Sequence, residues 1–370
     1  MSNLNRSRSA WLGFAAAVMV GWAASPAAGL EFGAGEIVRA DGTEIVVPGY
    51  SVPSFADWDG DGRKDLVIGE GSGSFPGKVR VYLNEGTAGQ PRFSSFSYVQ
   101  AGGSDLTCSG MGCMGCFPRV VQWDGDAKKD LLIGQADGTI RLFSNVGLDA
   151  APAFAGGTWL EVGPAGAKQR IDVGSRATAS FLDWGNDGRD DLVTGGLDGR
   201  IHLFVNQGSN ASPDFVSESF ALANGSNLAV PSGRSSPVVA DWTGDGLKDI
   251  LTGNTAGQLL LYANTGTDAA PSFAGHEYLT ADGVAIDLPG SPRSRPSACD
   301  WTSDGLPDVL VGSADGKVRL YQSVPEPAGL GLLAVGVAII LRRRPRRGWH
   351  AHVCPRGMPT SFRVGMGGDR

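Results

Sequence analysis

The strongest constraint on the fold of this chain is a short acidic string that occurs five times. The string begins as Asp57-Trp58-Asp59-Gly60-Asp61 and returns in altered form four more times along the chain. Its tryptophans are 65, 61, 58 and 59 residues apart, at Trp58, Trp123, Trp184, Trp242 and Trp301. A near-constant period of this length is typical of solenoids and propellers, in which each repeat is one supersecondary unit.

Each repeat has the same internal plan of four short strands. An apolar stretch leads into the acidic string, and a second apolar run, such as 66–69, follows it. A glycine turn such as Asp137-Gly138 then precedes a strand with period-two alternation, as in 139–143. A polar turn that opens with an asparagine, such as Asn145, precedes the fourth strand. Four strands per repeat is the plan of a propeller blade, and the 56 glycines among 370 residues supply its turns.

The two ends of the repeat array complement each other. The last repeat stops after its third strand at Tyr321, and a strand of the fourth type at 31–39 precedes the first repeat. We therefore predict an all-β fold: a five-bladed β-propeller of four-stranded blades in residues 30–323, whose N-terminal strand closes the last blade. An open β-solenoid is the structural alternative, and it has no need for complementary ends.

The acidic string has the residue types of a calcium site. Numbered from its first residue, side-chain oxygens occupy positions 1, 3, 5 and 9, and glycine is usual at position 6. Ca²⁺ takes about six to eight oxygen ligands, and the backbone carbonyl at position 7, which is Arg63 in the first repeat, can add one. The string is not an EF-hand, because its position 12, Ile68 in the first repeat, is apolar where that motif needs a bidentate glutamate.

The string resembles the calcium loop D-x-D/N-x-D/N-G-x-x-D of the FG-GAP/VCBS repeat family, which is known for calcium-bearing propellers such as those of integrin α-chains. The resemblance covers about residues 29–323 and implies unequal loops, since Gln122 stands at position 1 of the second and Gly185 at position 3 of the third. The implied Ca²⁺ ligands are Asp57, Asp59, Asp61, Arg63 and Asp65; Asp124, Asp126 and Asp130; Asp183, Asp187 and Asp191; Asp241, Thr243, Asp245 and Asp249; and Asp300, Thr302, Asp304 and Asp308.

The charge distribution favours a cation in these loops. Residues 29–324 hold 21 basic and 36 acidic side chains, a net charge of −15 that disfavours nucleic acid or an anionic membrane as a partner. Sixteen of those acids occupy the ligand positions, where clustered carboxylates repel one another unless a cation neutralises them. The alternative is an aspartate-rich turn that backbone hydrogen bonds hold without metal.

The first residues have the pattern of an export signal. Arg6 and Arg8 precede the apolar run 11–24, and the small residues around Ala27 offer a cleavage site. We therefore predict that residues 1–29 are a helical signal peptide that signal peptidase removes. A buried N-terminal helix is the alternative.

The other end of the chain resembles the PEP-CTERM sorting signal. Residues 324–347 contain Pro325-Glu326-Pro327, fourteen apolar residues at 328–341 and an arginine cluster at 342–347. The apolar run predicts a short hydrophobic helix, less than the ~20 residues of a stable membrane span. The resemblance implies transient membrane anchoring, an exosortase-type peptidase as a processing partner, and display at or release from the surface of a Gram-negative bacterium. Residues 348–370 are polar and unpatterned, and we expect them to be disordered.

Three cysteines fall in the connector before the second repeat. Cys108, Cys113 and Cys116 favour a disulfide whose pairing the sequence leaves open, and a soft metal site for Cu(I) or zinc is the alternative. The tryptophan that recurs after the first loop position favours packing between blades over the stacking of sugars.

The combined pattern predicts a binding protein rather than an enzyme. No set of serine, histidine and acid can be assembled, and we predict no catalytic residues. We expect an exported, calcium-binding propeller that binds an extracellular protein or polysaccharide through the connector face, which is the face opposite the calcium loops. The alternative is a polysaccharide-acting enzyme of the lyase kind on a calcium propeller scaffold.

Overall fold

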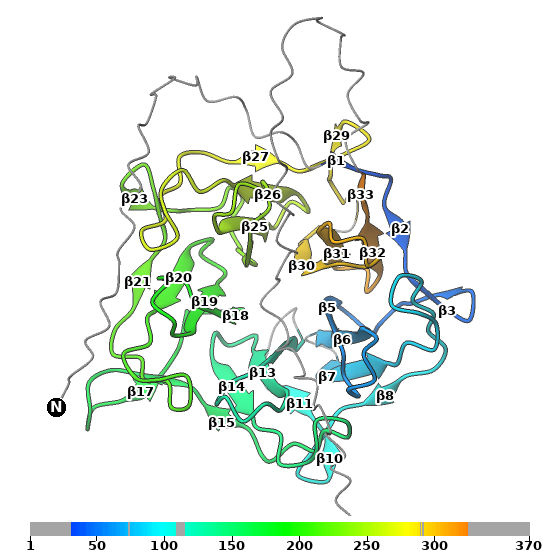
Figure 1. The fold of residues 1–370 in the computed structure, drawn as a ribbon, viewed down its shortest axis with the longest axis horizontal. Helices are drawn as coiled ribbons and strands as arrows, with labels where there is room; N and C mark the ends of the chain where they lie inside the picture. Colours follow the sequence, from blue (N-terminus) through cyan, green and yellow to red (C-terminus); the bar gives the residue numbers. More distant parts are fainter. Residues whose placement is uncertain (1–30, 73–74, 109–114, 289, 291, 325–370) are drawn as a thin grey trace, which may run out of the picture.

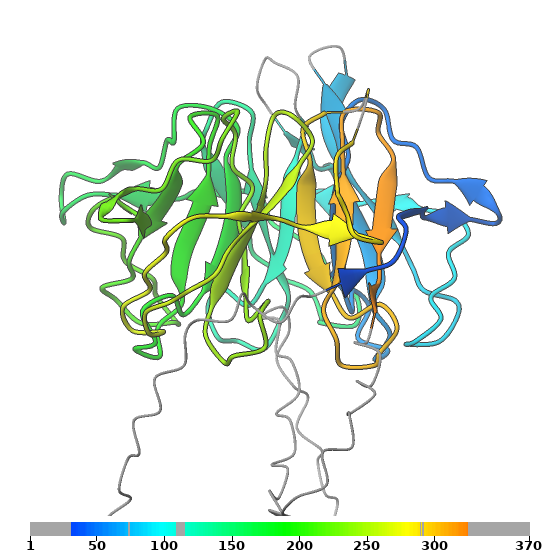
Figure 2. The ribbon, with the colours of Figure 1, turned by 90° about the horizontal axis from the view of Figure 1, so that it is seen from above.

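The computed structural model describes residues 31–72, 75–108, 115–288, 290 and 292–324. These residues form an all-β propeller, whose sheets surround a central axis (Figure 1) and make a disc in the edge-on view of Figure 2. The described residues contain no helix, and therefore none long and apolar enough to cross a membrane. The helices predicted in 1–29 and 324–347 and the tail predicted at 348–370 lie outside the described residues, except for Val324, which is in a strand.

Each of the five repeats builds one antiparallel sheet. The first contains β5 (Val52–Ala56), β6 (Asp65–Ser72), β7 (Phe75–Tyr82) and β8 (Ser97–Tyr98), with β11 (Thr107–Cys108) also paired to β7. The second contains β12 (Phe117–Val121), β13 (Asp130–Gly134), β14 (Ile140–Phe143) and β15 (Thr158–Trp159). The third contains β18 (Thr178–Leu182), β19 (Asp191–Gly195), β20 (Ile201–Phe204) and β21 (Ser219–Phe220). The fourth contains β24 (Val238–Ala240), β25 (Asp249–Gly253), β26 (Leu259–Tyr262) and β27 (Glu277–Tyr278). The fifth joins β30 (Arg295–Cys299), β31 (Asp308–Gly312) and β32 (Val318–Tyr321) to β2 (Glu36–Ile37) from the start of the described chain.

A sixth four-stranded sheet corrects the predicted architecture. It contains β29 (Val284–Ala285), β28 (Thr280–Ala281), β1 (Glu31–Phe32) and β33 (Ser323–Val324), in that order. The propeller therefore has six sheets of four or more strands, and the prediction of five blades is wrong. The repeat count misses the sixth sheet because its strands come from both ends of the array and from the hairpin after β27, and no acidic loop connects two of its strands.

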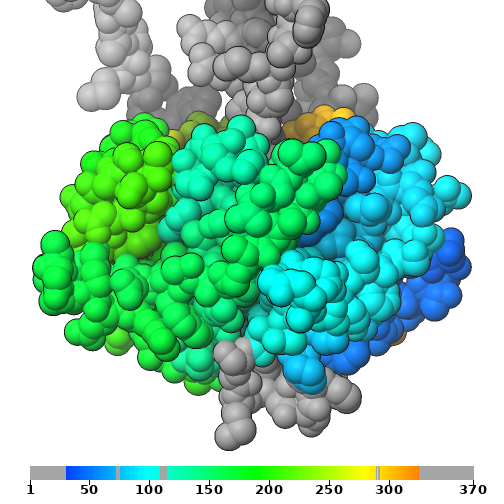
Figure 3. Space-filling view, turned by 90° about the horizontal axis from the view of Figure 1, so that it is seen from below, coloured from blue at the N-terminus to red at the C-terminus, as the bar shows by residue number. Residues whose placement is uncertain are grey.

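Short hairpins project from the rim between consecutive repeats. They are β3 (Arg39–Ala40) with β4 (Thr43–Glu44), β9 (Gln100–Ala101) with β10 (Ser104–Asp105), β16 (Glu161–Val162) with β17 (Gln169–Arg170), and β22 (Leu222–Ala223) with β23 (Ser226–Asn227). In the space-filling view of Figure 3, the cyan to green segments of the first three repeats pack side by side along one wall of the disc.

The core lies between neighbouring sheets as well as around the axis. The first strand of each repeat, β5, β12, β18, β24 or β30, is the sheet edge nearest the axis and is almost wholly buried. Four of the five loop tryptophans lie close to an aromatic ring of a neighbouring repeat. The ring of Trp123 stacks on Phe181 with centroids 4.5 Å apart, and that of Trp301 stacks on Phe55 at 4.9 Å. These contacts confirm the packing role predicted for the tryptophans.

Glycines in the second strands bring neighbouring repeats into close contact. A Cβ atom on Gly195 would lie 2.3 Å from the carbonyl oxygen of Ser235, at the start of the next repeat. The equivalent glycines, with 2.1–2.2 Å to the corresponding carbonyl, are Gly69, Gly134, Gly253 and Gly312. Gly312 faces Ser51 of the first repeat, so the contact links the last repeat to the first. Only a residue without a side chain allows this approach of two backbones.

We expect Gly195→Ala to lower the free energy of unfolding by about 1–3 kcal/mol, because the new methyl group overlaps backbone atoms of the next repeat. Urea unfolding followed by tryptophan fluorescence measures the change. Gly156→Ala is the matched control, since a Cβ atom there meets nothing within 4 Å. Equal stability of both variants would contradict this account of the packing.

Candidate functional site: the acidic loops

The five acidic loops lie at one end of the disc. Each loop joins the first strand of its repeat to the second, as between β5 and β6, and all five repeats run in the same direction relative to the axis. The connectors to the next repeat and the turns between second and third strands lie at the opposite end. The propeller thus presents an acidic loop face and a connector face (Figure 2).

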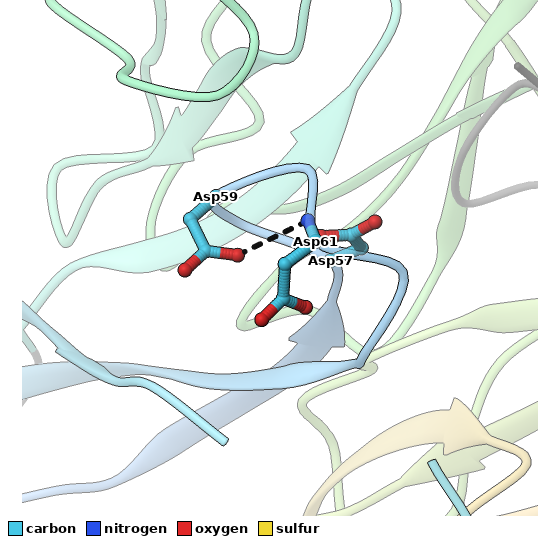
Figure 4. A group of neighbouring side chains, drawn as sticks. All are labelled: Asp57, Asp59 and Asp61. Carbon is cyan, nitrogen blue, oxygen red and sulfur yellow. Dashed lines mark hydrogen bonds between the residues drawn. The ribbon is translucent and has the colours of Figure 1, made fainter. Parts of the chain in front are cut away.

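The first loop gathers three carboxylates. One oxygen each from Asp57, Asp59 and Asp61 lies within 4.8 Å of the others, and Figure 4 shows the three side chains around one turn, with Asp59 accepting the backbone N–H of Asp61. The loop is folded by its own hydrogen bonds, since the backbone N–H groups of Gly60 and Gly62 donate to Asp57 at 2.8 and 3.0 Å. Both glycines have positive φ, at 74° and 89°, which an L-residue adopts at a cost. Among the described residues, this is the group of three or more acidic, histidine or cysteine ligands placed closely enough to hold one metal ion.

The aspartate at position 9 of each loop has a different environment. Asp65 is 1% exposed, and its Oδ2 accepts the backbone N–H of Trp58 at 2.7 Å while its Oδ1 accepts that of Asn84 at 2.7 Å. The same pair of bonds, to the residue at position 2 and to the turn after the third strand, recurs at Asp130, Asp191, Asp249 and Asp308. We call this arrangement the aspartate staple. It ties the loop, the second strand and the turn after the third strand together in every repeat.

Burial governs the ionisation of the staple aspartates. Loss of hydration raises the pKa of Asp65 and of Asp249 to about 6, against the lowering effect of the backbone N–H donors. The pKa values of Asp130, Asp191 and Asp308 also lie above the usual range for the same reason. A positive ion in the loop would favour the charged form of these groups.

Positions 1, 3, 5 and 7 of the first loop fit a calcium ion best. Asp57, Asp59 and Asp61 form the close group of carboxylates and the Arg63 carbonyl can add an oxygen, whereas Asp65 is buried and is not part of that group. In the fifth loop, the hydroxyl oxygen of Thr302 at position 3 is buried and has no hydrogen-bond partner among the described residues. A cation that takes this oxygen as a ligand would satisfy it.

Basic side chains compete for some loop carboxylates. The Arg63 guanidinium forms an ion pair with Asp61, Lys128 with Asp126 at 3.2 Å, and Arg189 with Asp187. The second and third loops also lack one carboxylate each, because Gln122 occupies position 1 of the second loop and Gly185 occupies position 3 of the third. That the loops bind metal unequally stays a prediction.

The connector before the second repeat, which we call the cysteine loop, contains a disulfide between Cys108 and Cys116. Their Cα atoms are 5.5 Å apart. This bond confirms the prediction of a disulfide and supplies the pairing that the sequence left open. Cys113 lies outside the described residues, and Cys299 is a buried free thiol.

The connector face carries an ion pair in the turn between β31 and β32. The Asp315 carboxylate accepts a hydrogen bond from the Arg319 guanidinium at 2.6 Å and another from the Ser313 hydroxyl at 2.6 Å. Burial alone would raise the pKa of Asp315, but the hydrogen bonds from Arg319 and Ser313 hold it well below the usual 3.8.

The geometry can be compared with known proteins. Residues 183–252 match the family model described as FG-GAP-like repeat. The match runs from the acidic loop of the third repeat to the second strand of the fourth. This match and the propeller architecture support the FG-GAP part of the resemblance found in the sequence, while its VCBS, calcium and sorting-signal parts stay predictions.

A comparison with curated proteins finds no match. Among solved structures, a chain of the Photorhabdus luminescens Tc holotoxin pore is 15% identical, with a TM-score of 0.37 over 73% of this chain and 11% of that one. A chain of the TcdB2-TccC3-Cdc42 structure is 13% identical, with a TM-score of 0.39 over 78% of this chain and 15% of that one. This chain thus spans a small part of both, and neither likeness bears on its function.

We expect the buried staple aspartates and the more exposed loop carboxylates to respond differently to mutation. In EDTA, we expect Asp65→Ala to lower the free energy of unfolding by about 2–4 kcal/mol, because it leaves two buried N–H donors without a partner. Asp61→Ala changes an exposed side chain and is expected to stay within about 0.5 kcal/mol of wild type in EDTA. Urea unfolding measures both. Equal losses in the two variants would contradict the separation of roles.

The ion pair at Asp315 predicts a pH dependence. A carboxyl group whose pKa is lower in the folded state stabilises the fold above its unfolded value near 3.8, and this stability is lost as the pH falls below it. We expect Asp315→Asn to cost about 1 kcal/mol at pH 7 and much less at pH 3. Asp137→Asn, in the equivalent turn of the second repeat, is the control. A cost for Asp315→Asn that does not change with pH would contradict the prediction.

Proposed function

We propose that this chain is an exported calcium-binding propeller that acts as a non-enzymatic binding module for an extracellular protein or polysaccharide. The observation that carries the proposal is the convergence of Asp57, Asp59 and Asp61 within 4.8 Å in a loop whose residue pattern recurs in all five repeats. Three carboxylates so close together repel one another in the absence of a cation.

The bound ion would have a structural role. Asp57, Asp59 and Asp61, with the Arg63 carbonyl, would hold it at the turn between β5 and β6, and water would complete the coordination of about six to eight oxygens. The ion would neutralise the loop and favour the ionised form of Asp65. Occupied loops would therefore stiffen the loop face and leave the connector face as the ligand-binding surface.

Export and surface display are the second part of the proposal. The pattern of residues 1–29 supports export, and Pro325-Glu326-Pro327, the apolar run and the arginine cluster support sorting by an exosortase-type peptidase at a Gram-negative surface. A disulfide in the cysteine loop agrees with an oxidising compartment.

Calcium titration of the purified propeller tests the metal. We expect added Ca²⁺ to raise the melting temperature, with about 2.7 kcal/mol of stabilisation for each site at a hundredfold excess over Kd. Asp61→Ala should remove the stabilisation that the first loop contributes, and Arg92→Gln, an exposed change outside the loop, should leave that stabilisation intact. An unchanged melting temperature in Ca²⁺ and in EDTA would refute calcium binding.

A panel of extracellular polysaccharides and proteins tests the binding role. We expect saturable binding to at least one polysaccharide or protein, with no unsaturated oligosaccharide released. Release of unsaturated oligosaccharide would instead identify a lyase and overturn the non-enzymatic assignment.

A further inference from the structure

The residue at position 7 divides the five acidic loops into two classes. It is basic in the first three loops and leucine in the last two, and the five residues are Arg63, Lys128, Arg189, Leu247 and Leu306. In every loop its backbone N–H donates to Oδ1 of the aspartate at position 5, at 2.8–3.0 Å. The backbone therefore makes the same turn in both classes, and the side chain at position 7 is what differs.

The basic side chains fold back onto the aspartate two residues before them. In the first loop, the guanidinium of Arg63 pairs with Oδ2 of Asp61. In the second loop, the ammonium of Lys128 lies 3.2 Å from Oδ2 of Asp126. In the third loop, two guanidinium nitrogens donate to Oδ2 of the aspartate at position 5. In each of these loops, one residue thus occupies both oxygens of this carboxylate, through its backbone and through its side chain.

The last two loops lack this internal cation. Asp245 and Asp304, at position 5, each accept the backbone N–H of the leucine two residues later. Within the part of the chain that the structure describes, no lysine or arginine forms an ion pair with either aspartate. The Oδ2 atom of both carboxylates is therefore available as a metal ligand without the opening of an ion pair.

The ion pair of the first loop is of a kind that a metal ion can replace. The side chains of Arg63 and Asp61 are 42% and 30% exposed, so water and salt screen their attraction. The Nε of Arg63 is buried and has no partner among the described residues, so the guanidinium does not hold the carboxylate through two parallel bonds. An exposed, single pair of this kind contributes little to stability, and a divalent cation attracts the same oxygen more strongly.

We propose that the side chain at position 7 sets the Ca²⁺ affinity of each loop. In the first three loops it is an internal cation on the position-5 carboxylate, and the pair has to open before Oδ2 can ligate a metal ion. In the last two loops, Leu247 and Leu306 impose no such cost. A basic side chain that stays near the loop also repels a bound cation, which weakens binding further. The proposal rests on the calcium binding proposed above and names the residues that tune it.

The internal cation has a second consequence for the first loop. When no metal ion is bound, Arg63 relieves part of the repulsion among Asp57, Asp59 and Asp61. The last two loops have no such substitute. Loops of the first class therefore tolerate the loss of Ca²⁺ better than loops of the second class.

An NMR titration of the protein with CaCl₂ reads single loops. The glycine at position 6 donates its backbone N–H to the aspartate at position 1, at 3.0 Å for both Gly62 in the first loop and Gly246 in the fourth. Each amide signal should therefore shift as its own loop fills. We expect Arg63→Leu to lower the Ca²⁺ concentration at the midpoint of the Gly62 shift about threefold, as the loss of an exposed ion pair predicts, and to leave the Gly246 midpoint unchanged.

The reverse exchange and a charge-matched control complete the test. Leu247→Arg should raise the midpoint of the Gly246 shift about threefold. Arg200→Leu removes the same charge as Arg63→Leu, but from the turn between β19 and β20 at the connector face, where the Arg200 side chain is 49% exposed. It should move neither midpoint. If Arg63→Leu does not fold, Arg63→Gln, which keeps a polar side chain at this position, takes its place.

The outcomes separate this inference from the calcium binding on which it rests. Ca²⁺-dependent shifts in wild type with unchanged midpoints in both exchange variants would overturn the tuning role and leave calcium binding intact. Equal changes in Arg200→Leu would reveal an effect of net charge and would also overturn it. If neither wild type nor Arg63→Leu shows any Ca²⁺-dependent shift, calcium binding itself is refuted, and this inference with it. A Gly62 shift that appears only in Arg63→Leu would support the inference in its strongest form.

Discussion

The structure depends on a carboxylate buried at the start of the second strand of each repeat. Each aspartate staple accepts one backbone N–H from the loop and one from the turn after the third strand, as Asp65 does for Trp58 and Asn84. Three chain segments meet there with donors that no strand partner satisfies. Because buried backbone donors need acceptors, the staple fixes the path of the chain at the same point in all five repeats.

This arrangement divides the acidic loop into two functional halves. The staple aspartate is buried and acts through hydrogen bonds, so it shapes the repeat without a cation. Asp57, Asp59 and Asp61 are more exposed and lie close together, so their mutual repulsion is what a cation would relieve. Positions 1 and 3 vary among the loops of this chain, as Gln122 and Gly185 show, whereas position 9 is aspartate in every one.

The innermost strands connect two faces of opposite chemistry. Each of them begins near the connector face and ends at an acidic loop, so β18 follows Arg176 and leads into Asp183. Repetition around the axis then places Arg176, Arg234 and Arg293 at one end of the propeller and the acidic loops at the other. The Gly–carbonyl contacts between repeats hold the innermost strands close together.

The sequence by itself determined the propeller architecture, the four-stranded repeat, the inter-repeat packing of the tryptophans and the position of the acidic loops. These features depend on local patterns, namely a period-two alternation, glycine turns and a string that recurs every 60 residues or so. Only the tertiary structure decided the sixth sheet and the staple. The sixth sheet joins residues far apart in the chain, such as Glu31 with Val324, and the staple joins three segments of one repeat. A local sequence pattern carries no information about which of these segments meet. The staple shows the limit most clearly: Asp65, which the sequence pattern predicts as a metal ligand, accepts in the fold the backbone N–H groups of the loop and of the turn after the third strand.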